Sequence, residues 1–113
     1  MPVRIYHNPR CNTSRKALAL LRANGVEPEI VEYLKTPPSA AELKTILGQL
    51  NMPATALLRK KEAAAAGIEP RALSEDALIA AMVEHPIVIE RPIVVSGVKA
   101  ALGRPPENVL AVV

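Results

Sequence analysis

The stretch VRIYHNPRCNTSRKALALLR, residues Val3–Arg22, decides the fold of this chain. Its first four residues alternate between apolar and polar side chains, which is typical of a strand. After a polar loop, Leu18 and Leu21 recur at the spacing of one helix face. We expect Thr13 or Ser14 to cap this helix and the Asn-Gly pair that follows it to end it in a left-handed turn. The chain therefore opens with a strand, a loop and a helix.

The only cysteine of the chain, Cys11, lies in that polar loop at the expected start of the helix. Unpaired backbone N–H groups and the macrodipole at a helix N-terminus stabilise a thiolate. A lone cysteine is more often a small buried apolar residue, but the polar loop favours a nucleophile here. Because the chain has no second cysteine, any redox chemistry must take its second thiol from another molecule.

The rest of the sequence continues an α/β pattern. Glu29–Tyr33 predicts a second strand, parallel to the first if the helix crosses over. The capping-box pattern that starts at Ser39 predicts a helix that stops at Gly48, and Ser74 begins another helix that ends at His85. The other expected elements are a short helix after residue 53, a mobile stretch around the alanines 63–66, a hairpin of residues 92–95 and 98–102, and a terminal helix from residue 107.

Composition restricts the class of protein. The 113 residues fit one domain, 1–113, without an internal boundary. No apolar run approaches the roughly 18 residues of a membrane span, and no secretory signal precedes the first strand, so we expect a cytoplasmic protein without membrane contact. The net charge of +3 is spread along a chain without Trp or Phe, which disfavours a nucleic-acid partner. His7 and His85 stand apart from other ligand-type side chains, so we expect no bound metal.

Five blocks of the sequence resemble, in order and approximate spacing, the glutaredoxin-coupled arsenate reductase family. The expected elements already outline that family's thioredoxin-like fold, with a helical insertion between a βαβ half and a ββα half. The resemblance covers almost the whole chain, and five blocks in order are more specific than any one of them. The blocks are HNPRCNTSR (7–15), YLKTPP (33–38), ALLRK (56–60), HPI (85–87) and RPIVV (91–95).

The resemblance implies an oxidoreductase that detoxifies arsenate. In that chemistry the thiolate of Cys11 attacks arsenate to give a covalent thioarsenate, glutathione adds as co-substrate, and glutaredoxin resolves the adduct with release of arsenite. The family's three functional arginines map onto Arg59, Arg91 and Arg104. Guanidinium groups suit this role because they neutralise an oxyanion and offer forked donors to tetrahedral oxygens, although each arginine by itself resembles a surface charge. No bound cofactor is expected.

Further residues near the nucleophile have two interpretations. A Ser14 hydroxyl one helical turn after Cys11 would donate a hydrogen bond to the thiolate and tune the acidity of the thiol, or it would simply cap the helix. His7 would assist the thiolate or make a structural hydrogen bond. By resemblance, Pro92 is the cis proline of the thioredoxin-like site. Asn12 stands where the family often has a small residue, and its side chain would narrow the oxyanion loop.

Three other functions are alternatives to arsenate reduction through glutaredoxin. Phosphatase-like arsenate reductases need a Cys-x5-Arg loop, and Ala17 occupies the arginine position. A glutathione-dependent thiol reductase of another substrate would use the same fold and the same cysteine. A non-catalytic regulator similar to the Spx family, which binds RNA polymerase, would also have a thioredoxin-like fold. Turnover with arsenate, glutathione and glutaredoxin separates these alternatives.

Overall fold

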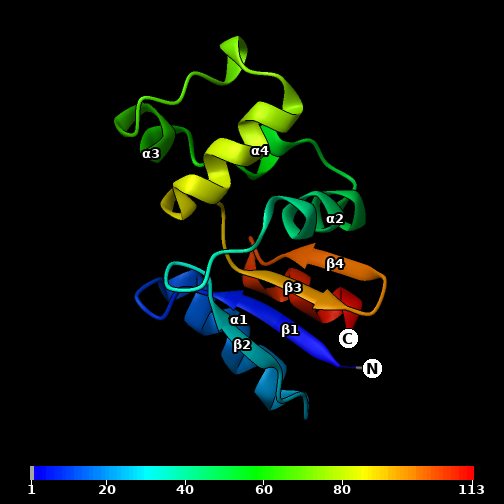
Figure 1. Cartoon of the computed structure of the whole chain (residues 1–113). Coiled ribbons are helices and arrows are strands. Elements are labelled where there is room, and N and C mark those ends of the chain that lie inside the picture. The colour runs from blue at the N-terminus through cyan, green and yellow to red at the C-terminus, as the bar shows by residue number, and fades with distance from the viewer. Residues whose placement is uncertain (1) are drawn as a thin grey trace. The chain divides into compact units, whose positions relative to one another are not determined.

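The computed structural model describes residues 2–113, which divide into two compact units (Figure 1). The first unit joins the N-terminal segment through Thr36 to Arg91–Val113, and the second unit is Pro37–Glu90. The expectation of one domain over the whole chain stays a prediction.

The first unit contains a four-stranded sheet with the order β2-β1-β3-β4. Strand β1 (Val3–His7) pairs in parallel with β2 (Glu29–Glu32) and antiparallel with β3 (Ile93–Ser96), which pairs antiparallel with β4 (Lys99–Leu102). Helix α1 (Asn12–Ala23) makes the crossover between the two parallel strands. The βαβ opening and the closing hairpin confirm the α/β arrangement predicted from the sequence.

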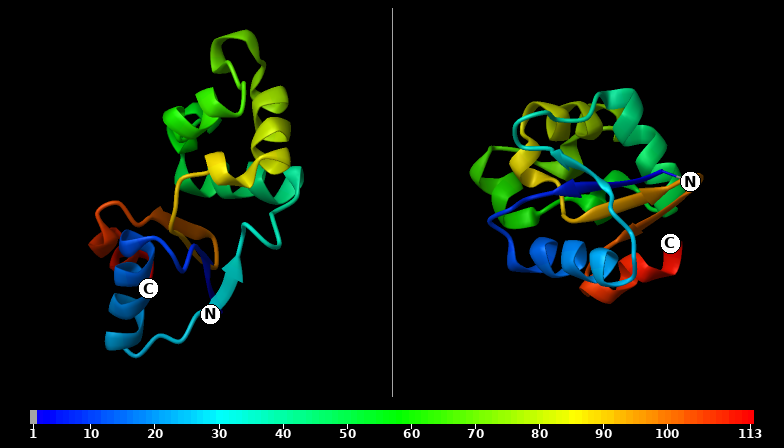
Figure 2. Two further views of the ribbon diagram at one scale, coloured as in Figure 1. Left: turned by 90° about the vertical axis from the view of Figure 1, so that its left-hand side faces the viewer. Right: turned by 90° about the horizontal axis from the view of Figure 1, so that it is seen from below.

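Helix α1 and the terminal 3-10 helix η4 (Pro106–Val112) lie on the same face of the sheet (Figure 2). The apolar side chains of α1 recur at the spacing of one helix face and are buried against the sheet, which explains why this segment forms a helix here. Burial of each large side chain of this kind contributes about 1.5–3 kcal/mol. The buried cluster consists of Ile5, Ala17, Leu18, Leu21, Val94 and Val109.

The second unit is helical. Helix α2 (Ala40–Leu50) packs against α4 (Glu75–Glu84), and the side chain of Ser39 accepts a hydrogen bond from the N–H of Glu42, as its capping-box pattern predicts. Ser74 caps α4 in the same way through the N–H of Ala77. The shorter helices are η1 (Ala54–Leu57), α3 (Lys60–Ala65), η2 (Pro70–Ala72) and η3 (Pro86–Val88).

Three local predictions are wrong. Helix α2 does not stop at Gly48, because it continues to Leu50 and ends where Asn51 adopts a left-handed conformation with φ of 58°. The alanine-rich stretch expected to be mobile belongs largely to α3, as the high helix propensity of alanine explains. The N-cap of α1 is Cys11 rather than Thr13 or Ser14.

No helix among residues 2–113 is both long and apolar enough to span a bilayer.

Candidate active site

Cys11 lies where the loop after β1 meets the first turn of α1. It is the N-cap residue, with φ of −95° and ψ of 122°, and it is partly exposed. The N–H of Cys11 donates to the carbonyl of Asn8 at 3.0 Å, and the N–H of Arg15 donates to the carbonyl of Cys11 at 3.0 Å. The loop is therefore a closed turn that presents the thiol at the positive end of a helix of 12 residues, as the sequence predicts.

A buried hydrogen-bond network connects the first turn of α1 to the end of β1 and the start of this loop. The Oγ atom of Ser14 lies 2.6 Å from Nδ1 of His7 and accepts the N–H of Asn8 at 3.1 Å. The exposed fractions are 0% for Ser14, 6% for His7 and 7% for Asn8. The Ser14 hydroxyl is therefore engaged by the end of β1 and the loop backbone. Its expected influence on the Cys11 thiol stays a prediction, because these partners do not include that thiol.

The imidazole of His7 is in a setting that favours its neutral form. Burial lowers the pKa of His7, and the cations Arg22 and Arg15 act in the same direction, while the Glu32 carboxylate opposes them. A neutral imidazole has one donor nitrogen and one acceptor nitrogen, so it pairs with a hydroxyl in either tautomer. His7 thus makes the structural hydrogen bond that the sequence allowed.

Strand register places Arg91 and Arg104 at the same end of the sheet as the Cys11 loop. Tyr6 pairs with Ile93, so the residues before Ile93 lie beside the end of β1, where the loop begins. Ile93 also pairs with the last residue of β4, so Arg104 follows β4 at that same end. The topology of one unit therefore brings together the cysteine loop and two of the three expected arginines.

The guanidinium of Arg91 has no hydrogen-bond partner among the described residues. Its Nε and Nη1 atoms are buried and unpaired, whereas Nη1 of Arg104 donates to the backbone carbonyl of Arg91 at 3.0 Å. A buried donor without a partner costs about 1–3 kcal/mol, and more when the group is charged. An anion that accepts hydrogen bonds from these N–H groups would remove this free-energy cost. Arg91 therefore has the chemistry of a residue that binds an oxyanion.

The backbone around Arg91 and Arg104 is tightly packed. The Arg91–Pro92 peptide bond is cis, which confirms the expectation for Pro92, and the Arg104–Pro105 bond is also cis, which sequence reasoning missed. The N–H of Gly103 donates to the carbonyl of Pro92 at 2.8 Å. A Cβ atom on Gly103 would lie 2.8 Å from Cγ of Pro92, so only glycine fits this close approach without a shift.

Arg59 belongs to the second unit, so its position relative to Cys11 stays a prediction. It is the residue before α3 and lines a cavity of about 470 Å³. Its side chain forms ion pairs with Glu62 and Glu90, and neither acidic residue was noticed in the sequence. The Glu62 pair has a local signal in its spacing along α3, whereas the Glu90 pair depends on tertiary structure.

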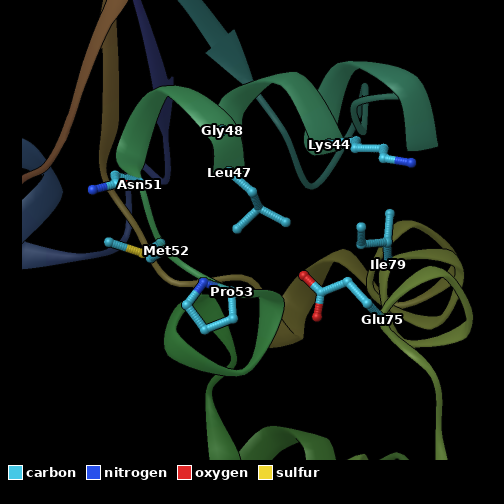
Figure 3. A pocket seen from close by; sticks show the side chains of 8 residues that line it. All are labelled: Lys44, Leu47, Gly48, Asn51, Met52, Pro53, Glu75 and Ile79. Atoms are coloured by element: carbon cyan, nitrogen blue, oxygen red, sulfur yellow. The ribbon is translucent and has the colours of Figure 1, made fainter.

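A second cavity, of about 420 Å³, lies between α2 and the start of α4 (Figure 3). The side chains of Leu47 and Glu75 face into the same space, and the Glu75 carboxylate accepts the N–H of Ala54 at 2.9 Å. None of the expected site residues lines it. No group of three or more His, Cys, Asp or Glu side chains able to hold a metal occurs within residues 2–113.

Arg15 lies in the first turn of α1, and its structural role was not predicted from the sequence. Its Nη1 atom donates to the carbonyl of Pro9 at 2.8 Å, and its Nη2 atom contacts Oδ1 of Asn12. The Asn12 side chain is therefore directed to Arg15. The expectation that Asn12 narrows the oxyanion loop stays a prediction. His85 is the C-cap of α4, in agreement with its expected place at a helix end.

Comparison with known proteins gives consistent matches. The profile of the ArsC family matches residues 6–112. The uncharacterised protein YfgD of Escherichia coli K12 is 54% identical over 98% of this chain and 96% of its own length. An arsenate reductase of Neisseria meningitidis serogroup B is 45% identical over 97% of each chain. A solved structure of an arsenate reductase from Vibrio cholerae has a TM-score of 0.89 and 47% identity, and the match covers 100% of this chain and 98% of that one.

Proposed function

Because this chain belongs to the ArsC family, we propose that it reduces arsenate to arsenite with the thiolate of Cys11 as nucleophile. The observation that carries the proposal is the unpaired, buried Nε and Nη1 of Arg91 at the end of the sheet where the Cys11 loop begins. A thiolate and an oxyanion repel each other, so a reaction between them needs a fixed cation that neutralises the incoming charge. Arg91 is available for that task, because its guanidinium has no hydrogen-bond partner among residues 2–113.

The proposed reaction consumes two external thiols for each arsenate. The Cys11 sulfur forms a bond to As(V), and one arsenate oxygen leaves as water. Glutathione then displaces a second oxygen as water and forms a second sulfur–arsenic bond. A glutaredoxin thiolate attacks the glutathione sulfur, and the electron pair of the broken sulfur–arsenic bond stays on arsenic, which becomes As(III). Water releases arsenite and restores Cys11, so the net products are arsenite, one water and the mixed disulfide.

The chain's own residues bind and orient in this scheme. Arg91 and Arg104 hold the arsenate oxygens, and Arg59 contributes a third guanidinium. Backbone N–H groups at the start of α1 supply further donors to the oxyanion. Glutathione acts as a co-substrate and glutaredoxin as the resolving partner, and no resident cofactor takes part. A supply of both thiols fits a reducing cytoplasm.

A coupled assay tests the proposal. It contains arsenate, glutathione, glutaredoxin, glutathione reductase and NADPH, and NADPH consumption reports turnover. We expect turnover by the natural chain and none by Cys11→Ser, because a hydroxyl at that position is not ionised at neutral pH. Full arsenate reduction by the serine variant would disprove the role of the nucleophile.

The role of Arg91 is tested in the same assay. Loss of one or two charge-assisted hydrogen bonds in Arg91→Ala predicts a decrease of about 10- to 100-fold in kcat/KM for arsenate. Arg71→Ala is the matched control, because Arg71 is exposed on the short helix η2. Equal kinetics of the two variants would contradict the assignment of Arg91 as an oxyanion ligand.

Other outcomes of the assay assign other functions. Turnover of a glutathione mixed disulfide without turnover of arsenate would indicate a glutathione-dependent thiol reductase. Failure of both reactions, with a thiol that is still alkylated, would favour a non-catalytic regulator similar to the Spx family.

A further inference from the structure

Asn8 is a buried polar residue in the loop between β1 and α1. It directly follows the last residue of β1 and precedes Pro9, and only 7% of it is exposed. Asparagine is mostly found at protein surfaces, because a buried amide is unfavourable unless its polar groups are hydrogen-bonded. The hydrogen-bond partners of Asn8 therefore indicate what its burial achieves.

Three hydrogen bonds of Asn8 hold the loop that leads to Cys11. The Asn8 N–H donates to Oγ of Ser14 at 3.1 Å, and its carbonyl accepts the N–H of Cys11 at 3.0 Å. Its side-chain Oδ1 accepts the N–H of Arg10 at 3.0 Å. The residue after Asn8 is a proline without an N–H, so these bonds include every backbone N–H from Asn8 to Cys11. Asn8 thus connects the end of β1, the turn and the first turn of α1.

The side-chain bond is the one that depends on residue type. The bond from the Arg10 N–H to Oδ1 of Asn8 is an Asx turn, in which a side chain reproduces a backbone turn. Only the oxygen of an amide accepts an N–H, so this bond also fixes the orientation of the Asn8 side chain. It lies within the turn that the Cys11 N–H and the Asn8 carbonyl close. Loss of Oδ1 would therefore loosen the turn that ends at Cys11.

The position of Cys11 follows from this turn and from the helix. Asn8 accepts the Cys11 N–H on one side, and the Cys11 carbonyl accepts the Arg15 N–H as the first bond of α1 on the other side. The sulfur thus belongs to a residue whose two peptide groups are both held. A displacement of about 1 Å in a reacting group costs about 100-fold in rate, so a restraint on Cys11 acts directly on its chemistry.

We propose that Asn8 is a positioning residue that holds Cys11 in place for its attack on the oxyanion. This inference rests on the proposed function, in which the Cys11 thiolate attacks arsenate. The Asn8 side chain acts through the turn and does not touch the substrate. Its loss should therefore slow the chemical step and leave the binding of arsenate to Arg91 intact.

Separate values of kcat and KM for arsenate test the proposal, in the coupled assay at saturating glutathione and glutaredoxin. We expect Asn8→Ala to decrease kcat about 10- to 100-fold and to change KM by less than about threefold. Asn8→Ser should give an intermediate kcat, because a hydroxyl accepts the same N–H more weakly.

Asn24→Ala is the matched control at the other end of the same helix. Asn24 is the exposed C-cap residue of α1, and its Nδ2 atom donates to the carbonyl of Leu20 at 2.8 Å. This variant also loses an asparagine side chain and one hydrogen bond to the backbone. Its kcat is expected to equal that of the natural chain, because the bond lies far along α1 from Cys11.

Two outcomes of the assay would overturn the proposal. Equal kcat values for Asn8→Ala and Asn24→Ala would show that the Asn8 side chain does not position Cys11. A higher KM at an unchanged kcat would show that Asn8 contributes to anion binding instead. If far-UV circular dichroism shows that Asn8→Ala does not fold, Asn8→Ser decides: a lower kcat at constant KM supports the proposal, and natural kinetics contradict it.

Amide hydrogen exchange separates failure of this inference from failure of the proposed function. The Cys11 N–H, followed by NMR, is expected to exchange about three- to tenfold faster in Asn8→Ala and at the natural rate in Asn24→Ala. A chain that reduces no arsenate but shows the faster exchange would disprove the proposed function and keep the restraint on Cys11. Unchanged exchange in Asn8→Ala would disprove the restraint, whatever the activity.

Discussion

Replacing Ser14 with alanine removes one oxygen atom that serves two buried polar groups. The Ser14 side chain is fully buried, and its Oγ atom is the partner of Nδ1 of His7 at 2.6 Å and of the Asn8 N–H at 3.1 Å. Both neighbours are themselves less than a tenth exposed. Alanine leaves both groups without this partner in a space that is one atom larger.

The expected loss of stability follows from the two unpaired groups. Each buried donor or acceptor without a partner costs about 1–3 kcal/mol, and local relaxation recovers part of this energy. We therefore expect Ser14→Ala to lower the free energy of unfolding by about 2–4 kcal/mol. For comparison, the Ser39 hydroxyl caps α2 at an exposed site, where its loss is worth about 1 kcal/mol.

Urea unfolding followed by far-UV circular dichroism measures both variants, since the chain has no Trp for fluorescence. The result that supports the reasoning is a larger loss for Ser14→Ala than for Ser39→Ala at an unchanged m-value. A loss for Ser14→Ala equal to or smaller than that for Ser39→Ala would refute it. Such a result would mean that His7 and Asn8 find new partners at little energetic expense.

Two further predictions concern His7 and Gly103 in the first unit. Because burial lowers the pKa of His7, the unfolded chain binds the proton more readily, so stability decreases as the pH falls through about 6.5 toward the folded-state pKa. Urea unfolding at a series of pH values checks this, and His7→Gln is expected to remove that part of the slope. Gly103→Ala is expected to lower the free energy of unfolding by about 1–3 kcal/mol, because its Cβ would lie 2.8 Å from Pro92 and 2.9 Å from Val109. Gly48→Ala on α2 has open space around the added carbon and is expected to be neutral or to stabilise by up to about 1 kcal/mol; equal losses for the two glycine variants would contradict the packing argument.

Local sequence patterns predicted the elements whose signals lie within a few residues. The capping positions Ser39 and Ser74 are confirmed because the side chain, the first-turn N–H and the apolar face all lie within one helical turn. The βαβ opening is confirmed because the chain alternates first at strand spacing and then at helix spacing. The family resemblance, not the local pattern, predicted the cis bond before Pro92.

The start of α1 shows why a correct motif gave a wrong cap. Ser14 has the side chain of an N-cap residue, and its position before Leu18 fits the pattern. In the structure, however, His7 and Asn8 at the end of β1 take the Ser14 hydroxyl, and the helix begins three residues earlier, directly after Cys11. A contact between two elements thus overrode a local preference, and it moved the cysteine from the loop to the N-cap.

The candidate site depends on contacts between residues that are distant in the sequence, even more than the start of α1 does. Arg91 and Arg104 come together because β1 and β4 end, and β3 begins, at the same end of the sheet, and only the register of the three strands shows this. The pairing of Arg59 with Glu90 depends on a bridge between segments far apart in the chain. The family resemblance predicted the arginines for an oxyanion, but it did not indicate which guanidinium is already paired.

Arg59 and Arg91 differ in their partners, and this difference bears directly on the site. If all three arginines were surface charges, each would extend into solvent, and none would have buried, unpaired donors. Arg91 instead keeps Nε and Nη1 buried without a partner, an arrangement that is unfavourable by itself and becomes favourable when an anion binds. Arg59, by contrast, already forms ion pairs with two carboxylates. The Arg91 guanidinium therefore still lacks an anionic partner, so loss of Arg91 should mainly weaken substrate binding.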